Sequence, residues 1–292
     1  SSIKLVIGWC GSPYSDSSVF KAYDIVLSNI PSLVTHFQKN GHRCEYMCHA
    51  FEPRILTKIN RNYPKNINFS FMGSIVKGND FHNQREQILT KIVKETDLQV
   101  WSYTAKPSQK ENKLLPYRQK LYDLVQKTKA IPGGKWLITS MPKIKNYADL
   151  PHRPDLSYYY VNATLANRSK PAIFGLAMYQ KLHESKVTLN THIDLSSQYA
   201  SNMRLYEATG VGTCLITDWK KNLHELFELE REVVTYKCAD EVIEKFKYLI
   251  ENYPKMESIA KAGQRKTLNY HNFEERALQL YQIIKKQDLG LY

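Results

Sequence analysis

The residues best placed for chemistry lie in one short stretch, Ser201–Asp218, where an arginine and a glutamate stand three positions apart. Arg204 follows a polar loop and opens a short helical segment that ends at Gly210, and Cys214–Thr217 is typical of a buried strand. Backbone N–H groups at a helix start, together with an arginine, form an anion site. The Glu207 carboxylate, about one turn further on, can accept two hydrogen bonds from a ribose diol. The same spacing is also typical of an ordinary surface ion pair, and the residues alone leave both interpretations open.

Other patterns that often carry chemistry fail on their spacing or context. Gly133–Lys135 is not followed by Ser or Thr, so it lacks the hydroxyl that holds magnesium in a phosphate-binding loop. Gly210–Gly212 follows a helix instead of a strand, and Leu215 stands where the dinucleotide fingerprint needs a small residue. Cys44 and Cys48 would lie about 13 Å apart on one strand, too far for two ligands of one zinc ion. No Asp-x-Asp occurs, so we expect neither a metal-held diphosphate nor a resident cofactor.

Composition indicates an ordinary folded chain with a basic bias. The 292 residues are 42% hydrophobic, and 41 Lys and Arg against 28 Asp and Glu give a net charge of +13. No apolar run approaches the ~18 residues of a membrane helix, and the first residues lack a signal-peptide pattern. Five cysteines are too few for a disulfide framework. We therefore expect reduced thiols, a cytoplasmic protein and an anionic partner, whether a phosphate-bearing substrate, an acidic membrane surface or nucleic acid.

Short apolar strands alternate with amphipathic helices along the chain, which is the pattern of a parallel α/β sheet. Three strands precede the polar stretch Pro53–Lys65, which we interpret as a linker, and a doubly wound domain usually has five or six. The expected strands are Ile3–Trp9, Tyr23–Ser28, Arg43–Cys48, Asn68–Met72, Leu98–Tyr103, Lys186–His192, Cys214–Thr217 and Glu232–Tyr236. The expected helices are Pro31–Gly41, Asp80–Glu95, Leu114–Lys129, Gly175–Glu184, Asn202–Thr209, Leu223–Phe227 and Asp240–Asn252, followed by two that begin near Pro254 and Asn272.

The region 130–171 interrupts this alternation. It is rich in Pro, Tyr, Asn and Lys, and we interpret it as an irregular insertion with one strand near Trp136–Thr139. The predicted division has four parts: an incomplete Rossmann-like domain at 1–53, a linker at 54–66, a complete Rossmann-like domain at 67–270, and a C-terminal helix at 271–292 that packs back on the first domain.

Several short motifs, taken in order, resemble the GT-B glycosyltransferases, and in detail their CgeB-like branch of spore-maturation and surface-polysaccharide enzymes. They are Tyr23–Leu27, Phe51–Arg54, Gly175–Tyr179, Leu189–His192, Asn202–Arg204, Glu207–Gly210, Thr217–Asp218, Asn222–Phe227 and Ala262–Gln264. Each motif is weak alone, but the set extends from about residue 4 to residue 286 and is specific as a whole. The resemblance implies a GT-B fold with two Rossmann-like domains. It also implies transfer of a sugar from a nucleotide diphosphate carrier.

The resemblance assigns roles to residues of the stretch Ser201–Asp218 and to the strand end before it. Glu207 matches the family glutamate that holds the ribose hydroxyls. Arg204 and the backbone at Asn202 and Met203 would face the diphosphate. His192 ends a strand at the carboxyl edge of the sheet, where open α/β sheets bind ligands. It is a candidate catalytic residue, although a histidine at a strand end is also commonly structural.

A second group of residues would complete the nucleotide site. Gly73 and Ser74, with Arg85 on the next helix, resemble the glycine loop that approaches the phosphates from the other side. Phe174 and Gly175 lie where the family has its base-binding loop. Positive side chains and helix N-termini would then replace a metal ion in stabilising the phosphate charge.

One position departs from the pattern of related retaining enzymes. They place an acidic residue eight positions before the ribose glutamate, and here that position is Tyr199, so the leaving-group role of that residue has no match in this sequence. The acceptor hydroxyl also needs a catalytic base, and no residue is assigned to that role. The expected partners are a nucleotide sugar, a glycan or lipid-linked acceptor and an anionic membrane surface on whose inner face the protein is peripheral. One alternative is a non-catalytic nucleotide-sugar-binding or scaffolding module. Another is a nucleic-acid-binding protein, which the scattered Lys and Arg and the lack of a known motif disfavour.

Overall fold

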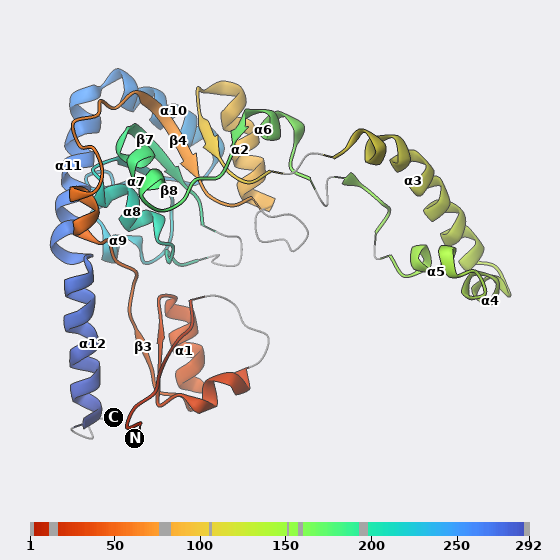
Figure 1. Cartoon of the computed structure of the whole chain (residues 1–292), viewed down its shortest axis with the longest axis horizontal. Coiled ribbons are helices and arrows are strands. Elements are labelled where there is room, and N and C mark those ends of the chain that lie inside the picture. Colours follow the sequence, from red (N-terminus) through yellow and green to blue (C-terminus); the bar gives the residue numbers. More distant parts are fainter. Residues whose placement is uncertain are drawn as a thin grey trace.

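The structure is a computed structural model that describes residues 3–11, 17–75, 83–104, 107–150, 152–156, 160–192 and 198–288. Two separate parallel sheets are present in the described part of the chain, and helices cover the larger one on both faces (Figure 1). The prediction of an α/β fold with parallel sheets is therefore confirmed. The smaller sheet comes from the N-terminal segment and the larger one from the rest of the chain.

The first sheet has the strand order β1-β2-β3 with all strands parallel, and β2 is buried on both faces. Val26 points toward α1 and packs with Phe37, whereas Ile25 and Leu27 point to the opposite face, as the two-residue period of a strand requires. The elements are β1 (Ile7–Trp9), a 3-10 segment (Ser17–Ala22), β2 (Ile25–Ser28), α1 (Pro31–Lys39) and β3 (Cys44–Tyr46).

The second sheet has six parallel strands in the order β6-β5-β4-β7-β8-β9. Its centre is formed by β4, β7 and β8, which are buried on both faces although polar residues such as Ser70 and Thr188 alternate with their apolar ones. The strands are β4 (Ile67–Met72), β5 (Gln99–Trp101), β6 (Ser169–Lys170), β7 (Ser185–Asn190), β8 (Cys214–Asp218) and β9 (Val234–Tyr236).

Two layers of helices cover this sheet (Figure 1). On one face, α2 and α10 pack over the strands, and the rings of Phe69 and Phe246 stack at 4.3 Å between centroids. On the other face, α7, α8 and α9 bury Leu182, Leu205 and Leu223. The helices are α2 (Asn83–Glu95), α6 (Ala163–Arg168), α7 (Gly175–His183), α8 (Arg204–Gly210), α9 (Leu223–Leu226), α10 (Ala239–Glu251) and α11 (Tyr253–Tyr270).

The two sheets are connected by the segment after β3 and by the last helix. Phe51 forms a bridge with the chain between α11 and α12 (Phe273–Asp288): its N–H donates to the His271 carbonyl at 2.8 Å. Figure 1 shows α12 continuing past the second sheet to lie beside the first. There Ile283 packs with Ile25 and Leu27. The C-terminal helix therefore lies against the first sheet.

Three helices between β5 and α6 form an arm that projects from the second sheet (Figure 1). They are α3 (Gln109–Lys129), α4 (Gly134–Thr139) and α5 (Pro142–Ala148). The predicted strand at Trp136–Thr139 is wrong, because these residues form α4. Gly133 adopts a left-handed φ of 78°, and a Cβ on Gly134 would come within 1.8 Å of the Thr128 carbonyl. This tight turn leads directly into a helical turn, and no described strand lies beside it to pair with.

Elsewhere the element types follow the sequence prediction and the ends shift by a few residues. The expected first strand shortens to β1, and the region expected to be an irregular insertion contains α6 and β6, which join the second sheet. The expected helix start at Asp80 lies outside the described residues. Among the described helices, none is both long enough and apolar enough to cross a bilayer.

Candidate functional site

The candidate site lies where the central strands of the second sheet end. β4 leads into Gly73, β7 leads into Thr191 and His192, and β8 ends at Asp218. Because β4, β7 and β8 are parallel neighbours, these residues meet at one edge of the sheet. The carboxyl edge is the place where open α/β sheets bind their ligands.

Arg85 fixes the geometry of this edge. Its buried guanidinium donates from Nη1 to the Ser74 carbonyl at 2.7 Å and from Nη2 to the Thr191 carbonyl at 2.6 Å. One side chain from α2 thus connects the turn after β4 with the end of β7. These two bonds use one N–H group of each terminal nitrogen and position the ends of β4 and β7, and the expected contact of Arg85 with phosphate stays a prediction.

The turn at Gly73 and Ser74 is held closely to the sheet. The Gly73 N–H donates to the Trp101 carbonyl on β5 at 3.2 Å, so this amide is not directed toward a ligand. A Cβ at Gly73 would stand 3.0 Å from the Phe71 ring, which explains why a glycine suits the position. Ser74 is exposed, and its carbonyl is the acceptor for Arg85.

Arg204 lies at the same edge, although it belongs to the first turn of α8. Its Nη2 donates to the Met72 carbonyl at the end of β4 at 2.9 Å, and its Nη1 lies 3.3 Å from the Met178 sulfur. Only 14% of the side chain is exposed. Its Nε is buried and has no hydrogen-bond partner among the described residues. The structure therefore places a nearly buried cation next to the end of β4, one residue before Gly73.

Glu207 pairs with Arg204, at 2.8 Å between Oε2 and Nη1, and its side chain is 12% exposed. The pair is thus an ion pair, but a nearly buried one instead of an ordinary surface pair. The hydroxyl of Tyr179 lies 3.4 Å from the second oxygen, Oε1. Burial and the neighbouring carboxylate raise the pKa of Tyr179 to about 12, so this hydroxyl keeps its proton and can donate it. Oε1 is the less engaged oxygen of Glu207.

Asn202 and Met203 have different surroundings. The side chain of Asn202 exchanges two hydrogen bonds with Asn190, at 2.7 and 3.2 Å, and Asn190 also donates to Thr217 at 2.9 Å. Asn202 therefore fixes the loop before α8 to the end of β7. Met203 is largely exposed and precedes the first helical residue of α8. The expected contact of the Asn202 and Met203 backbone with a diphosphate stays a prediction.

Phe174 and Gly175 form the start of α7. The Phe174 side chain is largely exposed, and Gly175 has a φ of 57°, a left-handed value that favours glycine. A ring presented at a helix start offers an apolar face to a planar group.

His192 forms a buried pair with Asp218. Nδ1 of the histidine lies 2.7 Å from Oδ1 of Asp218, and Lys220 lies 3.1 Å from Oδ2. Burial alone would raise the pKa of the Asp218 carboxyl, but the charges and hydrogen bonds of His192 and Lys220 lower it to about 2. An ionised carboxylate at Nδ1 assigns the proton to that nitrogen. Nε2 has no hydrogen-bond partner among the described residues.

The first sheet directs its own carboxyl edge toward this region. Asn29, directly after β2, donates from Nδ2 to the Ser201 carbonyl at 2.5 Å and lies 3.0 Å from Nε2 of His49. The Trp9 and His49 rings are 5.5 Å apart between centroids. Burial lowers the pKa of His49, which keeps the ring neutral near pH 7. Sequence reasoning missed Trp9, Asn29 and His49, although each lies at or shortly after the end of a strand.

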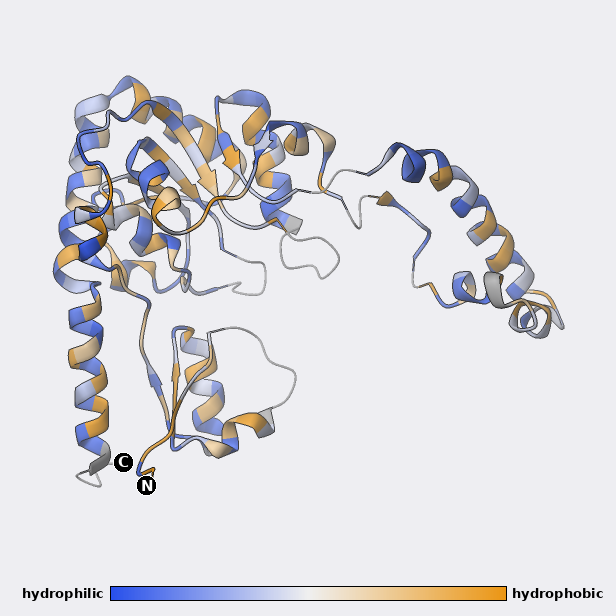
Figure 2. Ribbon diagram, in the orientation of Figure 1, coloured by the Kyte–Doolittle hydropathy of each residue, from blue (hydrophilic) through white to orange (hydrophobic). Residues whose placement is uncertain are grey.

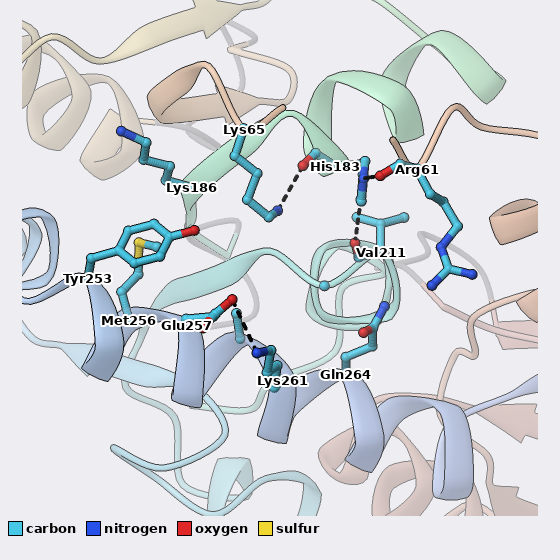
Figure 3. A pocket seen from close by; sticks show the side chains of 12 residues that line it. Arg61, Lys65, His183, Lys186, Val211, Tyr253, Met256, Glu257, Lys261 and Gln264 are labelled. Atoms are coloured by element: carbon cyan, nitrogen blue, oxygen red, sulfur yellow. Dashed lines mark hydrogen bonds and ion pairs between the residues drawn. The ribbon is translucent and has the colours of Figure 1, made fainter. Parts of the chain in front are cut away.

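A separate basic pocket of about 150 Å³ lies at the amino ends of the same strands (Figure 3). It is lined by Lys186 on β7, Gly212 before β8 and Lys65 before β4. Lys65 donates to the carbonyls of His183 and Ser185 at 2.7 and 2.9 Å. Burial lowers the pKa of Lys65 to about 8. Because Lys65 caps the end of α7 and the pocket is remote from Arg204, we do not place the nucleotide there.

Solved structures with a similar arrangement include GT-B glycosyltransferases. The sucrose-phosphate synthase of Thermosynechococcus elongatus has a TM-score of 0.53 at 11% identity, covering 94% of this chain and 60% of that chain. Anabaena Alr3699/HepE in complex with UDP-glucose has a TM-score of 0.55 at 12% identity, covering 92% and 66%. The glycosyltransferase from Rickettsia africae ESF-5 has a TM-score of 0.54 at 13% identity, covering 97% and 70%. At these identities the similarity shows the fold alone, and this chain spans less than two thirds of the length of the first two proteins.

The chain therefore has the GT-B fold, as predicted. The sequence pattern of the glycosyl transferase-like family matches residues 118–282, which is more than half of the 292 residues. The chain belongs to this glycosyl transferase-like family. The matched segment contains Arg204, Glu207, His192 and Asp218. Among curated proteins, none matches the sequence significantly.

Proposed function

We propose that this chain, as a CgeB-like glycosyltransferase, moves a sugar from a nucleotide diphosphate sugar to a hydroxyl of an acceptor. One observation carries the proposal. Arg204 is a nearly buried cation at the carboxyl end of β4, and its Nε has no partner among the described residues. A buried donor without a partner is uncommon in folded proteins, and a phosphate oxygen is a strong acceptor for a guanidinium.

In this proposal Arg204 and Glu207 bind different parts of the nucleotide. Arg204 takes the diphosphate through Nε. Glu207 takes the ribose hydroxyls through Oε1, because Oε2 already lies 2.8 Å from Arg204 while Oε1 has only the long contact with Tyr179. The exposed ring of Phe174 offers a face for the base. Because Anabaena Alr3699/HepE has been solved in complex with UDP-glucose, UDP is the first nucleotide to test.

The chemistry follows from the charge that develops during transfer. When the sugar leaves, its diphosphate gains negative charge, and a preorganised guanidinium at low solvent exposure stabilises that charge more than water does. We expect no metal requirement, because the sequence has no Asp-x-Asp and Arg204 supplies positive charge. His192 would act through Nε2, which in the neutral ring with its proton on Nδ1 can accept a hydrogen bond from a sugar or acceptor hydroxyl.

The acceptor in this proposal is a glycan or a lipid-linked sugar used in building surface polysaccharide. The net charge of +13 favours work next to an anionic membrane, to which the chain would bind peripherally on the inner face. A module that binds the nucleotide sugar without transfer is the alternative outcome, and a turnover assay separates the two.

Calorimetric titration of UDP, GDP, TDP and CDP tests the nucleotide site directly. Arg204→Gln should weaken binding of the preferred diphosphate by about 10- to 100-fold, because it removes a charge-assisted hydrogen bond worth about 1.5–3 kcal/mol. Binding of the matching nucleoside, which lacks phosphates, should change little. Addition of EDTA should leave the affinity unchanged. Equal losses for diphosphate and nucleoside would remove Arg204 from the phosphate site, and loss of binding in EDTA would contradict the metal-independent mechanism.

A further inference from the structure

The arm, residues 107–156, has a surface whose composition needs an explanation. Its helices α3, α4 and α5 make their main contacts with one another. Figure 2 shows hydrophobic and hydrophilic residues side by side along α3, on a part of the chain that stands away from the second sheet. Ten Lys and Arg against four Asp and Glu give the arm a net charge of +6, nearly half of the charge of the whole chain.

Exposed apolar side chains form a row along the arm. Tyr117, Leu124 and Ile131 recur every seven residues, and their exposed fractions are 72%, 61% and 59%. Seven residues are close to two helical turns, so Tyr117 and Leu124 lie on one face of α3, and Ile131 extends the row into the turn after it. At the end of the arm, Trp136 on α4 is 75% exposed. Large apolar side chains exposed in a continuous row usually mark an interaction surface.

A row of lysines lies beside the apolar row. Lys113, Lys120 and Lys127 are exposed and repeat at the same seven-residue interval. Each is three or four residues from a member of the apolar row, so the two rows are neighbours on the helix surface. Lys135, also exposed, continues the basic character next to Trp136.

The carboxylates of α3 do not neutralise these lysines. Glu111 accepts hydrogen bonds from Ser108 and from the hydroxyl of Tyr160, and Asp123 pairs with Arg153 at 2.8 Å. Within the described residues, no ion pair involves Lys113, Lys120 or Lys127. Asp123 also feels the charge of Lys127, but the arm keeps a net charge of +6 beside its apolar row.

We propose that the arm binds an anionic lipid bilayer, with Tyr117, Leu124, Ile131 and Trp136 in the interface between headgroups and acyl chains. An apolar face flanked by lysines is the pattern of a helix that lies in a membrane interface. A second copy of the chain fits less well, because the lysine rows of two copies would repel. Nucleic acid fits less well too, because the aliphatic Leu124 and Ile131 separate the two aromatic side chains of the row, whereas successive bases stack on neighbouring aromatic rings.

This inference rests on the membrane-proximal acceptor of the proposed function and gives it a structural basis. A lysine near an anionic surface raises the membrane affinity of a protein about fivefold. The three lysines of the row together should therefore raise it about 100-fold. The attraction should weaken steeply between low and physiological salt, because exposed charges are screened beyond about 8–10 Å.

The test uses the full chain in co-sedimentation with vesicles of phosphatidylcholine alone, or with one third phosphatidylglycerol. The triple variant Lys113→Gln, Lys120→Gln, Lys127→Gln should bind the anionic vesicles about 100-fold less than the original chain. A matched control, Lys247→Gln, Lys255→Gln, Lys286→Gln, removes the same charge from exposed positions on α10, α11 and α12. It should change binding little. Equal losses in both triple variants would overturn the arm as the binding surface.

A second measurement examines the apolar row. Trp136→Gln should weaken binding to anionic vesicles several-fold without changing the charge, and an unchanged affinity would contradict insertion of this row.

Light scattering shows whether the chain dimerises through the arm, and a dimer in place of vesicle binding would overturn the proposal. UDP affinity and melting temperature, measured on every variant, separate the two proposals. A variant that loses vesicle binding but still binds UDP shows an effect of the arm that is separate from the nucleotide site. If the original chain does not bind UDP, the proposed function fails, whatever the vesicles show.

Discussion

Replacement of Glu207 by glutamine is the sharpest perturbation of the proposed site. The substitution keeps the size of the side chain, and its amide oxygen can still accept a hydrogen bond from Arg204. What it removes is the negative charge that lies 2.8 Å from the guanidinium. Glu207→Ala is a less specific change, because it would leave Arg204, with 14% of its side chain exposed, without its carboxylate partner.

The expected loss of affinity follows from Oε1 of Glu207, the oxygen that is left to bind a ligand. If Oε1 accepts two ribose hydroxyls, each bond to a carboxylate contributes about 1.5–3 kcal/mol, against about 0.5–1.5 kcal/mol for a bond to a neutral amide. Glu207→Gln should therefore weaken the preferred nucleoside diphosphate by about 2 kcal/mol, roughly 30-fold. Glu207→Ala should weaken it by about 2–4 kcal/mol, roughly 30- to 1000-fold, and should also cost about 1–3 kcal/mol of stability.

Isothermal titration of the diphosphate and the matching nucleoside, with thermal melting of each variant, measures both effects. The affinity for both ligands should fall, because the ribose is common to them. Glu228→Gln is a matched control, since Glu228 pairs with Arg231 at 2.9 Å with the same separation of three residues but on an exposed surface. It should leave affinity and melting temperature nearly unchanged. An affinity that survives Glu207→Gln while the melting temperature falls would show that Glu207 serves only to stabilise Arg204.

Three further predictions concern stability. Gly210→Ala should destabilise the fold by about 1–3 kcal/mol in urea denaturation, because its Cβ would lie 2.4 Å from the Phe51 ring. Ile283→Ala should cost about 2–4 kcal/mol by removing the contact of α12 with the first sheet, and an unchanged denaturation midpoint would contradict that packing. Burial lowers the pKa of His271 to about 4, so the folded state keeps it neutral while the unfolded chain takes up a proton near pH 6.5. The contribution of the neutral His271 to the free energy of unfolding is present above pH 6.5 and is lost toward pH 4. Between pH 7 and 4.5 the free energy of unfolding of the original chain should therefore fall by about 2–3 kcal/mol more than that of His271→Gln.

The fold was readable from the sequence because its central strands are buried on both faces. β8 begins with a short apolar run, β7 alternates its apolar Val187 and Leu189 with polar residues, and amphipathic helices such as α10 repeat their apolar residues at helical spacing. Both patterns are local. The prediction of a strand at Trp136–Thr139 is wrong because three apolar residues followed by a threonine suit a strand or a helical turn equally. Only the turn at Gly133 and the absence of a neighbouring described strand decide between them.

The candidate site was readable only in part, because several of its roles depend on contacts between distant residues. Arg204 and Glu207 are three residues apart, so their pairing could be expected from helical spacing. Arg85 contacts the carbonyl of Thr191, which is 106 positions away, and nothing in the sequence indicates this contact. The contact between Asn29 and Ser201 joins the two sheets over 172 positions and was equally hidden.

The pairing of Arg204 with Glu207 explains how two residues can serve both stability and binding. A guanidinium this far from solvent needs strongly polar partners, because an unpaired buried charge is costly. Within the chain, Glu207 and the Met72 carbonyl supply them. A diphosphate brings more negative charge than one carboxylate and meets Nε, which no described residue holds. We therefore expect the diphosphate to take over the neutralisation of Arg204, which frees the Glu207 carboxylate to turn toward the ribose. The ion pair before binding then becomes two separate ligand contacts after it.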